Sequence, residues 1–550
     1  MDLPAGELRV AAGYQWRKNR VTYTPDLLQS SRAFEDQVIG VYPVGDMDAT
    51  TSVDDYYVEA LVPVLGDVGL IQGLELELGA RFSDYSDNDS EWTYKTLANI
   101  QANDWLRLRG GYNRATRAPN VGEKYLGFQQ VYLRGVRNNF GDPCGLRSNA
   151  PFGAGGALPD PILAPGEPET QLASGQTAAG AQSTLLICQA QMGPEGAGQY
   201  YIGNAGGGSG GNANWVYQEG NPDLGPETAD TFSAGFVANS PWDNVWLQNL
   251  TLSFDWWRIE IEDAIQQYTP DYANYLCYGV RTVTNAAEAA AQAATTDCQN
   301  VARNPATGGA TRQLLRYSNQ ATIETEGIDI AANWRAELGD LGIPLPGGLN
   351  LSMQMTYIDT YKTKESQEDF DVEIDWAGSL GPTLTGTNPG AYDYRLFTSL
   401  TYFKDDWSVG LRWRHLPDVI TANQAKQNAL VANNAAAAAG AAGAVPLSYT
   451  PFTDIGINQY DIFDMSFNWT INETLTLRGG ITNLLDTSPE ITGRQAGYPP
   501  GTDLSAVCGG APGCVNPTAP QLASTGAGIT SPGYYDVLGR RFFLGVKARF

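Results

Sequence analysis

The chain lacks any long apolar segment. No run of about 18 or more apolar residues occurs, and the Ala-rich stretch 435–444 is short and contains glycine, so no transmembrane helix is expected. The first residues, Met1-Asp2-Leu3-Pro4, are neither basic nor continuously apolar, so no signal peptide is expected there. A chain of this kind crosses a membrane only as a barrel of strands.

Charge and metal-binding residues are also scarce. Charged residues make up 17% of the chain and the formal net charge is -26, which argues against a nucleic-acid partner, because phosphates need clustered Lys and Arg. His415 is the only histidine and no Cys-x-x-Cys motif occurs, so no zinc site is expected. The acidic runs 84–91 and 368–375 lack EF-hand spacing and are interpreted as solvated loops. No metal and no cofactor are expected.

What the sequence has in abundance is alternation, most clearly at the C-terminus. Apolar residues occupy every second position there: Phe542, Leu544, Val546, Ala548 and Phe550. The residues between them are mostly cationic or small. Since successive side chains of a strand point to opposite faces, this segment predicts a strand with one apolar and one polar face. A lipid-facing apolar row that ends on an aromatic residue is typical of the last strand of an outer-membrane barrel.

Similar alternation recurs along the whole chain and favours strands over helices, which would repeat near 3.6 residues. About fourteen strands are predicted. They cover residues 8–24, 51–63, 72–85, 90–101, 104–115, 228–240, 246–262, 314–336, 347–361, 391–404, 406–417, 458–470, 473–485 and 538–550. The predicted fold class is therefore all-β, a transmembrane antiparallel up-and-down β-barrel.

The connections between these strands are alternately short and long, as short periplasmic turns and long extracellular loops would be. The short set is 64–71, 102–103, 241–245, 337–346, 405 and 471–472. The long set is 25–50, 116–227, 263–313, 362–390, 418–457 and 486–537, with 86–89 as a short member. Both chain ends are then periplasmic. Aromatic residues at the predicted periplasmic strand ends, where an interfacial girdle belongs, support this orientation: Trp105, Trp242, Trp246, Trp407, Trp469 and Phe550.

All six cysteines lie in the long loops. Six cysteines allow fifteen pairings, but each loop that holds cysteines holds two. The loop assignment favours the sequential disulfides Cys144–Cys188, Cys277–Cys298 and Cys508–Cys514, which persist outside the cytoplasm. In the loop 263–313, Asn285 followed by an Ala-rich run predicts a short helix over 285–295 with Asn285 as its N-cap.

Several stretches resemble the C-terminal part of a TonB-dependent outer-membrane receptor. They are RLRGGYNRATRAPNVGEKY at 107–125, GNPDLGPETADTFSAGFV at 220–237, NQATIETEGIDIAANW at 319–334, ITNLLDTSPEITG at 481–493 and the terminal strand from Asp536. In this family each stretch marks a particular barrel strand, in this order. The size and the loops are similar to those of large proteobacterial receptors that take up carbohydrates and other nutrients.

The resemblance implies a 22-stranded barrel with a plugged lumen. Residues 1–550 would then be a partial barrel that lacks the plug domain and the N-terminal strands. Lumen charges would lose partners on the plug, namely Arg107, Arg109, Arg412 and Arg414. The resemblance also implies a place in the bacterial cell outer membrane, with contacts to lipid and lipopolysaccharide. The TonB complex would act through the missing plug, and the barrel-assembly machinery would contact the C-terminal strand as an insertion signal.

The expected function is active uptake of a nutrient, with carbohydrate as one candidate ligand and a siderophore as the alternative. The loop aromatics Tyr200, Tyr201, Trp215 and Tyr217 would stack on sugar rings. Near the outer rim, Arg114 and Arg117 would meet an anionic ligand. The competing interpretation of all six residues is packing between loops.

Three other functions stay open. A passive channel of fourteen strands would need ring closure between 8–24 and 538–550. An outer-membrane hydrolase would need a nucleophile and a base, and His415, in phase with Leu411 and Trp413, is the only histidine; we expect no enzyme. A soluble β-sandwich or lectin fits the alternation but does not explain the placement of the tryptophans.

Overall fold

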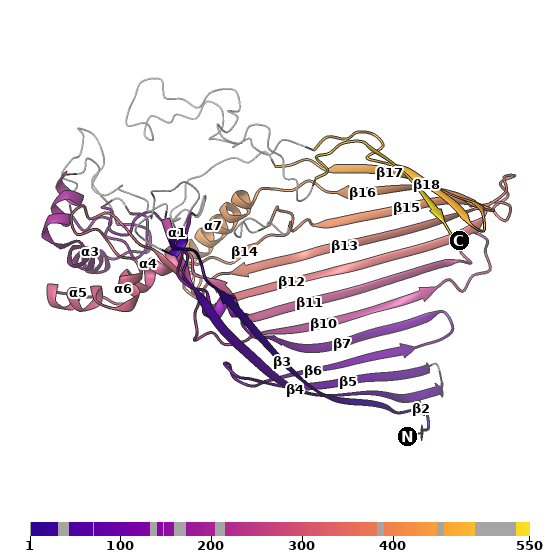
Figure 1. Cartoon of the computed structure of the whole chain (residues 1–550), viewed down its shortest axis with the longest axis horizontal. Coiled ribbons are helices and arrows are strands. Elements are labelled where there is room, and N and C mark those ends of the chain that lie inside the picture. The colour runs from indigo at the N-terminus through magenta and orange to yellow at the C-terminus, as the bar shows by residue number, and fades with distance from the viewer. Residues whose placement is uncertain are drawn as a thin grey trace.

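The strands that alternation predicts form one large antiparallel sheet. The computed structural model describes residues 2–30, 43–69, 71–132, 140–146, 148–158, 172–203, 215–381, 390–447, 456–489 and 535–549. Figure 1 shows long strands running side by side, with the helices gathered at one end and the short turns at the other. Both labelled chain ends lie at the turn end, as the loop lengths predict (Figure 1). No helix of the described ranges is long and apolar enough to span a membrane.

Each long strand pairs with the next long strand along the chain. In this order they are β3 (Arg9–Tyr23), β4 (Met47–Val68), β5 (Ile71–Tyr85), β6 (Glu91–Gln101), β7 (Leu106–Arg117), β10 (Glu227–Asn239), β11 (Leu250–Gln267), β12 (Leu314–Glu337), β13 (Gly348–Lys364), β15 (Tyr394–Lys404), β16 (Trp407–Leu416), β17 (Tyr460–Asn472), β18 (Leu475–Thr482) and β19 (Arg541–Ala548). The predicted strands and the up-and-down order are therefore confirmed.

The shorter elements lie around this sheet. Near the first residues, β1 (Asp2–Leu3) pairs with β2 (Gly6–Glu7). At the loop end, β8 (Gln129–Tyr132) pairs with β9 (Trp215–Glu219), β9 runs parallel to β12, and β14 (Ile374–Asp375) pairs with β13. The helices are α1 (Leu27–Ser30), α2 (Val121–Tyr125), α3 (Ala178–Gly198), the π-helical turn η2 (Gln199–Gly203), α4 (Pro270–Tyr278), α5 (Ala286–Ala293), α6 (Thr296–Asn300) and α7 (Ala422–Ala438).

The registers give the sheet one polar and one apolar face. Ser399, Arg412 and Asp464 lie side by side on β15, β16 and β17, and the neighbouring row is Leu400, Leu411 and Met465. Because facing residues of an antiparallel pair share a face, polar and apolar rows continue in this way across the sheet. We call the two sides the polar face and the apolar face. The pattern is that of a barrel wall with lipid on one side.

Tryptophans lie at the turn end of the sheet. Trp407 begins β16 and lies opposite Trp469 of β17. Trp242 and Trp246 lie in the turn between β10 and β11, where their side chains are 59% and 55% exposed. Trp105 directly precedes β7. The predicted position of these residues beside the short turns is confirmed, whereas Phe550 lies outside the described residues.

The two outermost strands are β3 and β19. In the described residues, no paired register joins β19 to β3. Nearly every residue of β3 and of β19 is exposed, on both faces of the strand. Phe542 and Leu544 are 73% and 77% exposed. The sheet therefore has two open edges in this arrangement, because an internal strand of a closed barrel would be covered by neighbours on both sides.

Candidate functional site

The polar face carries two hollows, each of about 360 Å³. The first is lined by Asn99, Gln101, Asp104, Trp105, Arg107, Arg109, Val237 and Asn239 near the short turns. The second is lined by Gln15, Tyr57, Glu59, Gly79, Ala80, Arg81, Thr93, Tyr94, Lys95 and Asn113 in the middle of the strands. Most of these residues belong to polar-face rows. The polar face is thus the hollowed side of the sheet, as the lumen side of a barrel wall would be.

Most charges on this face have partners on neighbouring strands. Lys95 lies 2.6 Å from Glu77 and 3.0 Å from Glu59. Arg109 forms a two-pronged pair with Asp255, and its Nε donates to Oδ1 over 2.6 Å. Arg414 lies 3.2 Å from Asp464. Arg109 and Arg414 therefore have carboxylate partners within the sheet itself, which the sequence did not predict.

Beyond the strand ends, four long loops share one hydrophobic core, which we call the loop core. The loop 116–227 contributes residues such as Leu146, Phe152 and Met192, and the loop 263–313 contributes Tyr272 and Val301. The loops 362–390 and 418–457 each add one buried residue, and these are Phe370 and Leu447. Ring centroids of Phe370 lie 5.3 Å from Phe152 and 4.9 Å from Tyr275. The loops thus pack as one body of their own at the end of the sheet (Figure 1).

Two disulfides lie inside the loop core, and all four of their cysteines are fully buried. They are Cys144–Cys188, which ties the start of the loop 116–227 to α3, and Cys277–Cys298, which ties α4 to α6. Both predicted pairs are confirmed. The third pair, Cys508–Cys514, lies outside the described residues. The predicted helix is also confirmed as α5, whose N-cap Asn285 accepts from the backbone N–H groups of Ala287 and Glu288.

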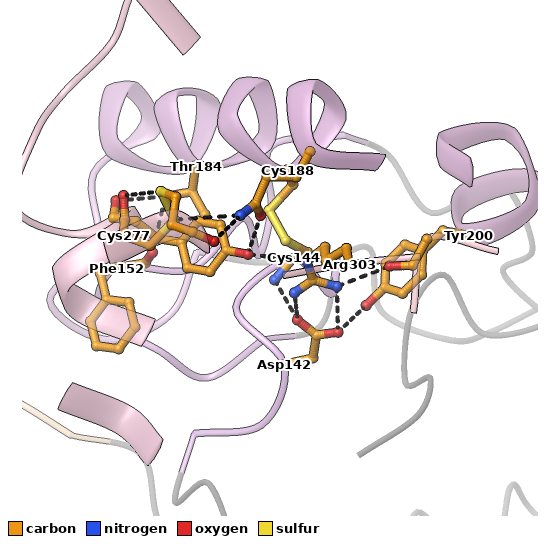
Figure 2. Close-up of a disulfide and its surroundings, with 12 residues drawn as sticks. Asp142, Cys144, Phe152, Thr184, Cys188, Tyr200, Cys277 and Arg303 are labelled. Carbon is orange, nitrogen blue, oxygen red and sulfur yellow. Dashed lines mark hydrogen bonds and ion pairs between the residues drawn. A yellow bond between two sulfur atoms is a disulfide. The ribbon is translucent and has the colours of Figure 1, made fainter. Parts of the chain in front are cut away.

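A buried ion pair lies beside the first disulfide (Figure 2). The guanidinium of Arg303 binds both carboxylate oxygens of Asp142, and the side chains of the two residues are 2% and 8% exposed. Tyr200 donates its hydroxyl to Asp142 over 2.7 Å, and the backbone N–H of Cys144 donates over 2.9 Å. Arg303 Nε donates to the Tyr278 hydroxyl over 3.1 Å. The charges are paired and their polar atoms have partners, which burial of charge requires.

The electrostatics of this cluster follow from burial and charge together. Burial alone would raise the pKa of Asp142, but the charge of Arg303 and the hydrogen bonds to the carboxylate hold that pKa below its usual range. Burial and the carboxylate of Asp142 raise the pKa of Tyr200 well above its usual range. Asp142 is therefore ionised and Tyr200 is neutral at physiological pH. This cluster is built for stability, because nothing in it is poised to exchange a proton near neutrality.

The outer rim of the sheet carries a second network, formed by three of the sequence stretches described above. Arg117 at the end of β7 binds Glu227 of β10 through Nε at 2.6 Å and Glu123 through Nη1 at 3.0 Å. Asn120 and Glu123 form a capping box at the start of α2. Asn319 of β12 donates to the carbonyl of Gly225 and accepts from its N–H, both over 2.9 Å. The stretches near 117, 225 and 319 thus lock together where the strands enter the loops.

Comparisons with known proteins identify this architecture. The sequence pattern of the family described as TonB dependent receptor-like, beta-barrel, matches residues 2–484. The chain belongs to this family. No curated protein sequence matches the chain at a significant level.

Solved structures show the same fold at low sequence identity. A variant of the ferric enterobactin receptor from Pseudomonas aeruginosa in complex with enterobactin matches with a TM-score of 0.50 and 12% identity, over 100% of this chain and 52% of that one. The ferric enterobactin receptor in complex with the ligand BCV-L6 matches with a TM-score of 0.51 and 13% identity, over 98% and 52%. The siderophore receptor PirA from Acinetobacter baumannii matches with a TM-score of 0.46 and 14% identity, over 88% and 49%. The chain spans about half the length of these structures.

In this TonB-dependent receptor barrel, the aromatic residues predicted to contact a ligand belong to the loop packing. Tyr200 and Tyr201 are 1% and 5% exposed, and the hydroxyl of Tyr201 donates to the carbonyl of Cys144. Tyr217 on β9 is stacked on Phe128, with centroids 4.8 Å apart. Trp215 begins β9, and its side chain lies outside the described part of the structure. The structure corrects the prediction for the three tyrosines, because buried rings cannot stack on a sugar.

The two predicted arginines are also engaged in other contacts. Arg117 is held by Glu227 and Glu123, as described above. Arg114 lies in register with Tyr94 and Asp230, on the apolar face, and its guanidinium is 3.7 Å from Asp230. Contact of Arg114 or Arg117 with an anionic ligand at the outer rim stays a prediction.

His415 lies on the apolar face near the outer rim. Its Nδ1 is 2.8 Å from Asp461, and its Nε2 is 3.0 Å from the hydroxyl of Tyr394. The indole of Trp413 donates to the same Asp461 oxygen over 2.7 Å. The imidazole thus lies between a carboxylate and a phenol, and no serine hydroxyl is among its described hydrogen-bond partners. This arrangement does not favour the hydrolase that was left open by the sequence.

Sequence reasoning missed the loop core and the Asp142–Arg303 pair. The cysteines were the available signal, since Asp142 lies two residues before Cys144 and Arg303 lies five residues after Cys298. Nothing in the spacing shows that these two loops meet. The polar-face hollows were missed for the same reason, because they are made by residues of several strands.

Proposed function

We propose that this chain forms barrel wall and extracellular loops of an outer-membrane receptor that takes up a nutrient by TonB-dependent transport. The observation that carries the proposal is the family match over most of the chain, together with the division of its sheet into a polar and an apolar face. A plug would fill the lumen side, and the TonB complex would act through it. Residues 1–550 are accordingly proposed as a partial barrel domain.

The proposed environment follows from the same two faces. The apolar rows would contact lipid and, in the outer leaflet, lipopolysaccharide. The row Phe542, Leu544, Val546 and Ala548 would serve as the insertion signal for the barrel-assembly machinery. Its strand edge is open in this structure, which supports a role in strand pairing during assembly.

The ligand is proposed as a nutrient of the carbohydrate or siderophore class. The similar structures include receptors for ferric enterobactin, and their sequence identity to this chain is too low to transfer their ligand to it. The loop core supports a receptor role, because it gives the long loops a fixed shape on which a ligand could be held. We place ligand contact on the outer surface of these loops and on the polar face.

Uptake by cells tests this proposal. The gene would be deleted in its own host, and growth would be compared on oligosaccharides and on ferric siderophores under iron limitation. We expect the deletion strain to lose uptake of one of the two classes of nutrient. A strain without TonB should show the same loss. Uptake that persists without TonB, or no change for either class, would overturn it.

The passive channel has less support. It needs β3 and β19 to pair, and no such pairing exists in the described residues. Conductance of the purified chain in a planar bilayer tests it. A stable open channel would favour the passive channel over the receptor.

A further inference from the structure

The polar face is not uniform in charge around the sheet. From β3 to β13 cations and carboxylates nearly balance. The cations are Arg9, Arg17, Arg81, Lys95, Arg107, Arg109, Arg117 and Arg335, and the carboxylates are Asp55, Glu59, Glu75, Glu77, Glu91, Glu227, Asp255, Asp329 and Glu337. Many of them form direct cross-strand pairs. This part of the face is called the balanced wall.

From β15 to β19 the balance is lost. The polar-face cations of these strands are Arg395, Arg412, Arg414, Arg478, Arg541 and Lys547. Among the described residues of the same strands and face, Asp464 is the single carboxylate. Arg541 pairs with Asp536, which lies outside the strands, at 2.8 Å. This part of the face is called the cationic wall, and it occurs in a chain whose net charge is -26.

The cations form a track along the strands. Arg414 lies opposite Ile462, Arg412 opposite Asp464, and Arg478 opposite Asn468. Asp464 and Asn468 are four residues apart on one strand, about 13 Å at the usual rise of a strand. Lys547 lies opposite Thr476, nearer the short turns. Positive groups thus follow one another from the outer rim to the turn end.

The residues between the cations of this wall are mostly uncharged. They are small at Ser399, Gly410 and Ser466 and large at Phe397 and Phe543. Arg412 and Arg478 are exposed, and no ion pair to either occurs among the described residues. The other described acidic residues near the wall lie beyond the strand ends: Asp393, Asp405, Asp406, Asp418, Glu473, Asp486 and Asp536. Exposed guanidinium groups with free donors bind carboxylate, phosphate and sulfonate groups well.

We propose that the cationic wall is a binding track for a small multivalent anionic solute, carrying carboxylate, phosphate or sulfonate groups, on its way through the lumen. A row of like charges on one face of a sheet concentrates counter-ions along it. The inference rests on the proposed function for the direction of movement, since it places the solute on the lumen side of a transport barrel. It assigns the solute class from the residues of this chain.

Binding of a trisulfonated pyrene dye to the full chain in detergent micelles tests the proposal directly. Wild-type protein is expected to bind the dye with an affinity that falls as salt is raised. The double variant Arg412→Gln/Arg478→Gln is expected to weaken binding by about tenfold, as two lost exposed charge contacts would. The matched control Arg17→Gln/Arg107→Gln removes the same charge from the balanced wall and should change the dissociation constant by less than about twofold.

Equal weakening by both double variants, or no binding by the wild-type chain, would overturn the proposal. If Arg412→Gln/Arg478→Gln does not fold, the charge-keeping variant Arg412→Lys/Arg478→Lys and the single variants replace it. Binding must then survive in the lysine variant and weaken in each single glutamine variant. Dye binding is measured independently of cellular uptake. If the uptake experiment fails while dye binding is intact, the proposed receptor function is rejected but the proposed anion binding is not.

Discussion

At the scale of single residues, burial decides which side chains have the roles that the sequence suggested. Exposed tyrosines in a long loop would be natural ligand contacts, yet Tyr200 and Tyr201 are buried beside the Asp142–Arg303 pair. The four described cysteines pair as predicted, because a pair within one loop can be predicted without knowledge of the other loops. The contact of Asp142 with Arg303 joins residues that are 161 positions apart in the chain, and no local sequence pattern predicts it.

The buried ion pair gives the first prediction. Arg303→Met should lower the free energy of unfolding of the loop core by about 3–5 kcal/mol, because it leaves the carboxylate of Asp142 buried without a partner. Limited proteolysis of the loops in detergent, as a function of temperature, measures this loss. The double variant Arg303→Met/Asp142→Leu is the control and should recover much of the stability. An unchanged proteolysis profile in Arg303→Met would contradict the account.

The second prediction concerns pH and Asp371, which follows Phe370. Burial, and next the charge of Glu365, raise the pKa of Asp371 to about 7. A carboxyl with a raised pKa binds more protons in the folded state, so its contribution to stability is full below about pH 4 and is lost as pH rises to about 7. Asp371→Asn should therefore be more stable than wild type at pH 8 and lose this advantage at pH 4.

Thermal unfolding of the loops, followed by near-ultraviolet circular dichroism at pH 4, 6 and 8, measures the difference. The variant Asp369→Asn serves as the control, since it removes a carboxylate from the same segment. A constant offset between Asp371→Asn and wild type over the whole range would rule out the proposed titration.

At the scale of elements, alternation found the strands and missed their ends. The predicted strand 51–63 stopped at its proline, but β4 continues to Val68 because a register shift between Pro63 and Leu65 accommodates that residue. The prediction also ended β11 at 262, whereas its last residues pair with 317–321 and carry the strand into the loops. At β18 the strand ends before Asn483, whose positive φ of 53° turns the chain.

The disulfides give a prediction at this scale. Cys144→Ser/Cys188→Ser should destabilise the loop core by roughly 2–4 kcal/mol, since the loop between the two cysteines gains freedom when unfolded. The strand pairings lie outside this loop, so the sheet should be unaffected. Proteolysis of the loops measures the first effect, and heat-modifiable migration on a gel measures the second. Loss of heat-modifiable migration together with loop cleavage would show that the loops and the sheet fold as one unit.

At the scale of the whole molecule, the sequence predicts the sheet well because each strand carries its own two-residue period. The long loops carry no such period, and their shared core depends on contacts between four segments far apart in the chain. The charge difference between the balanced wall and the cationic wall also appears only once the registers assign every residue to a face. A pattern within one segment can thus be recognised from the sequence, whereas the arrangement of segments relative to one another is known only from the structure.

The central claim is that lipid surrounds the apolar face and that water or protein covers the polar face. Nitroxide labels at Leu400, Leu411 and Met465 would report on the apolar row, and labels at Thr401, Gly410 and Ser466 on the neighbouring polar row. The collision of each label with oxygen and with a water-soluble nickel complex would be measured in the chain reconstituted into outer-membrane lipid. The account predicts that oxygen dissolved in the bilayer reaches the first three labels and that the nickel complex reaches the other three. The opposite pattern, or no alternation, would contradict it.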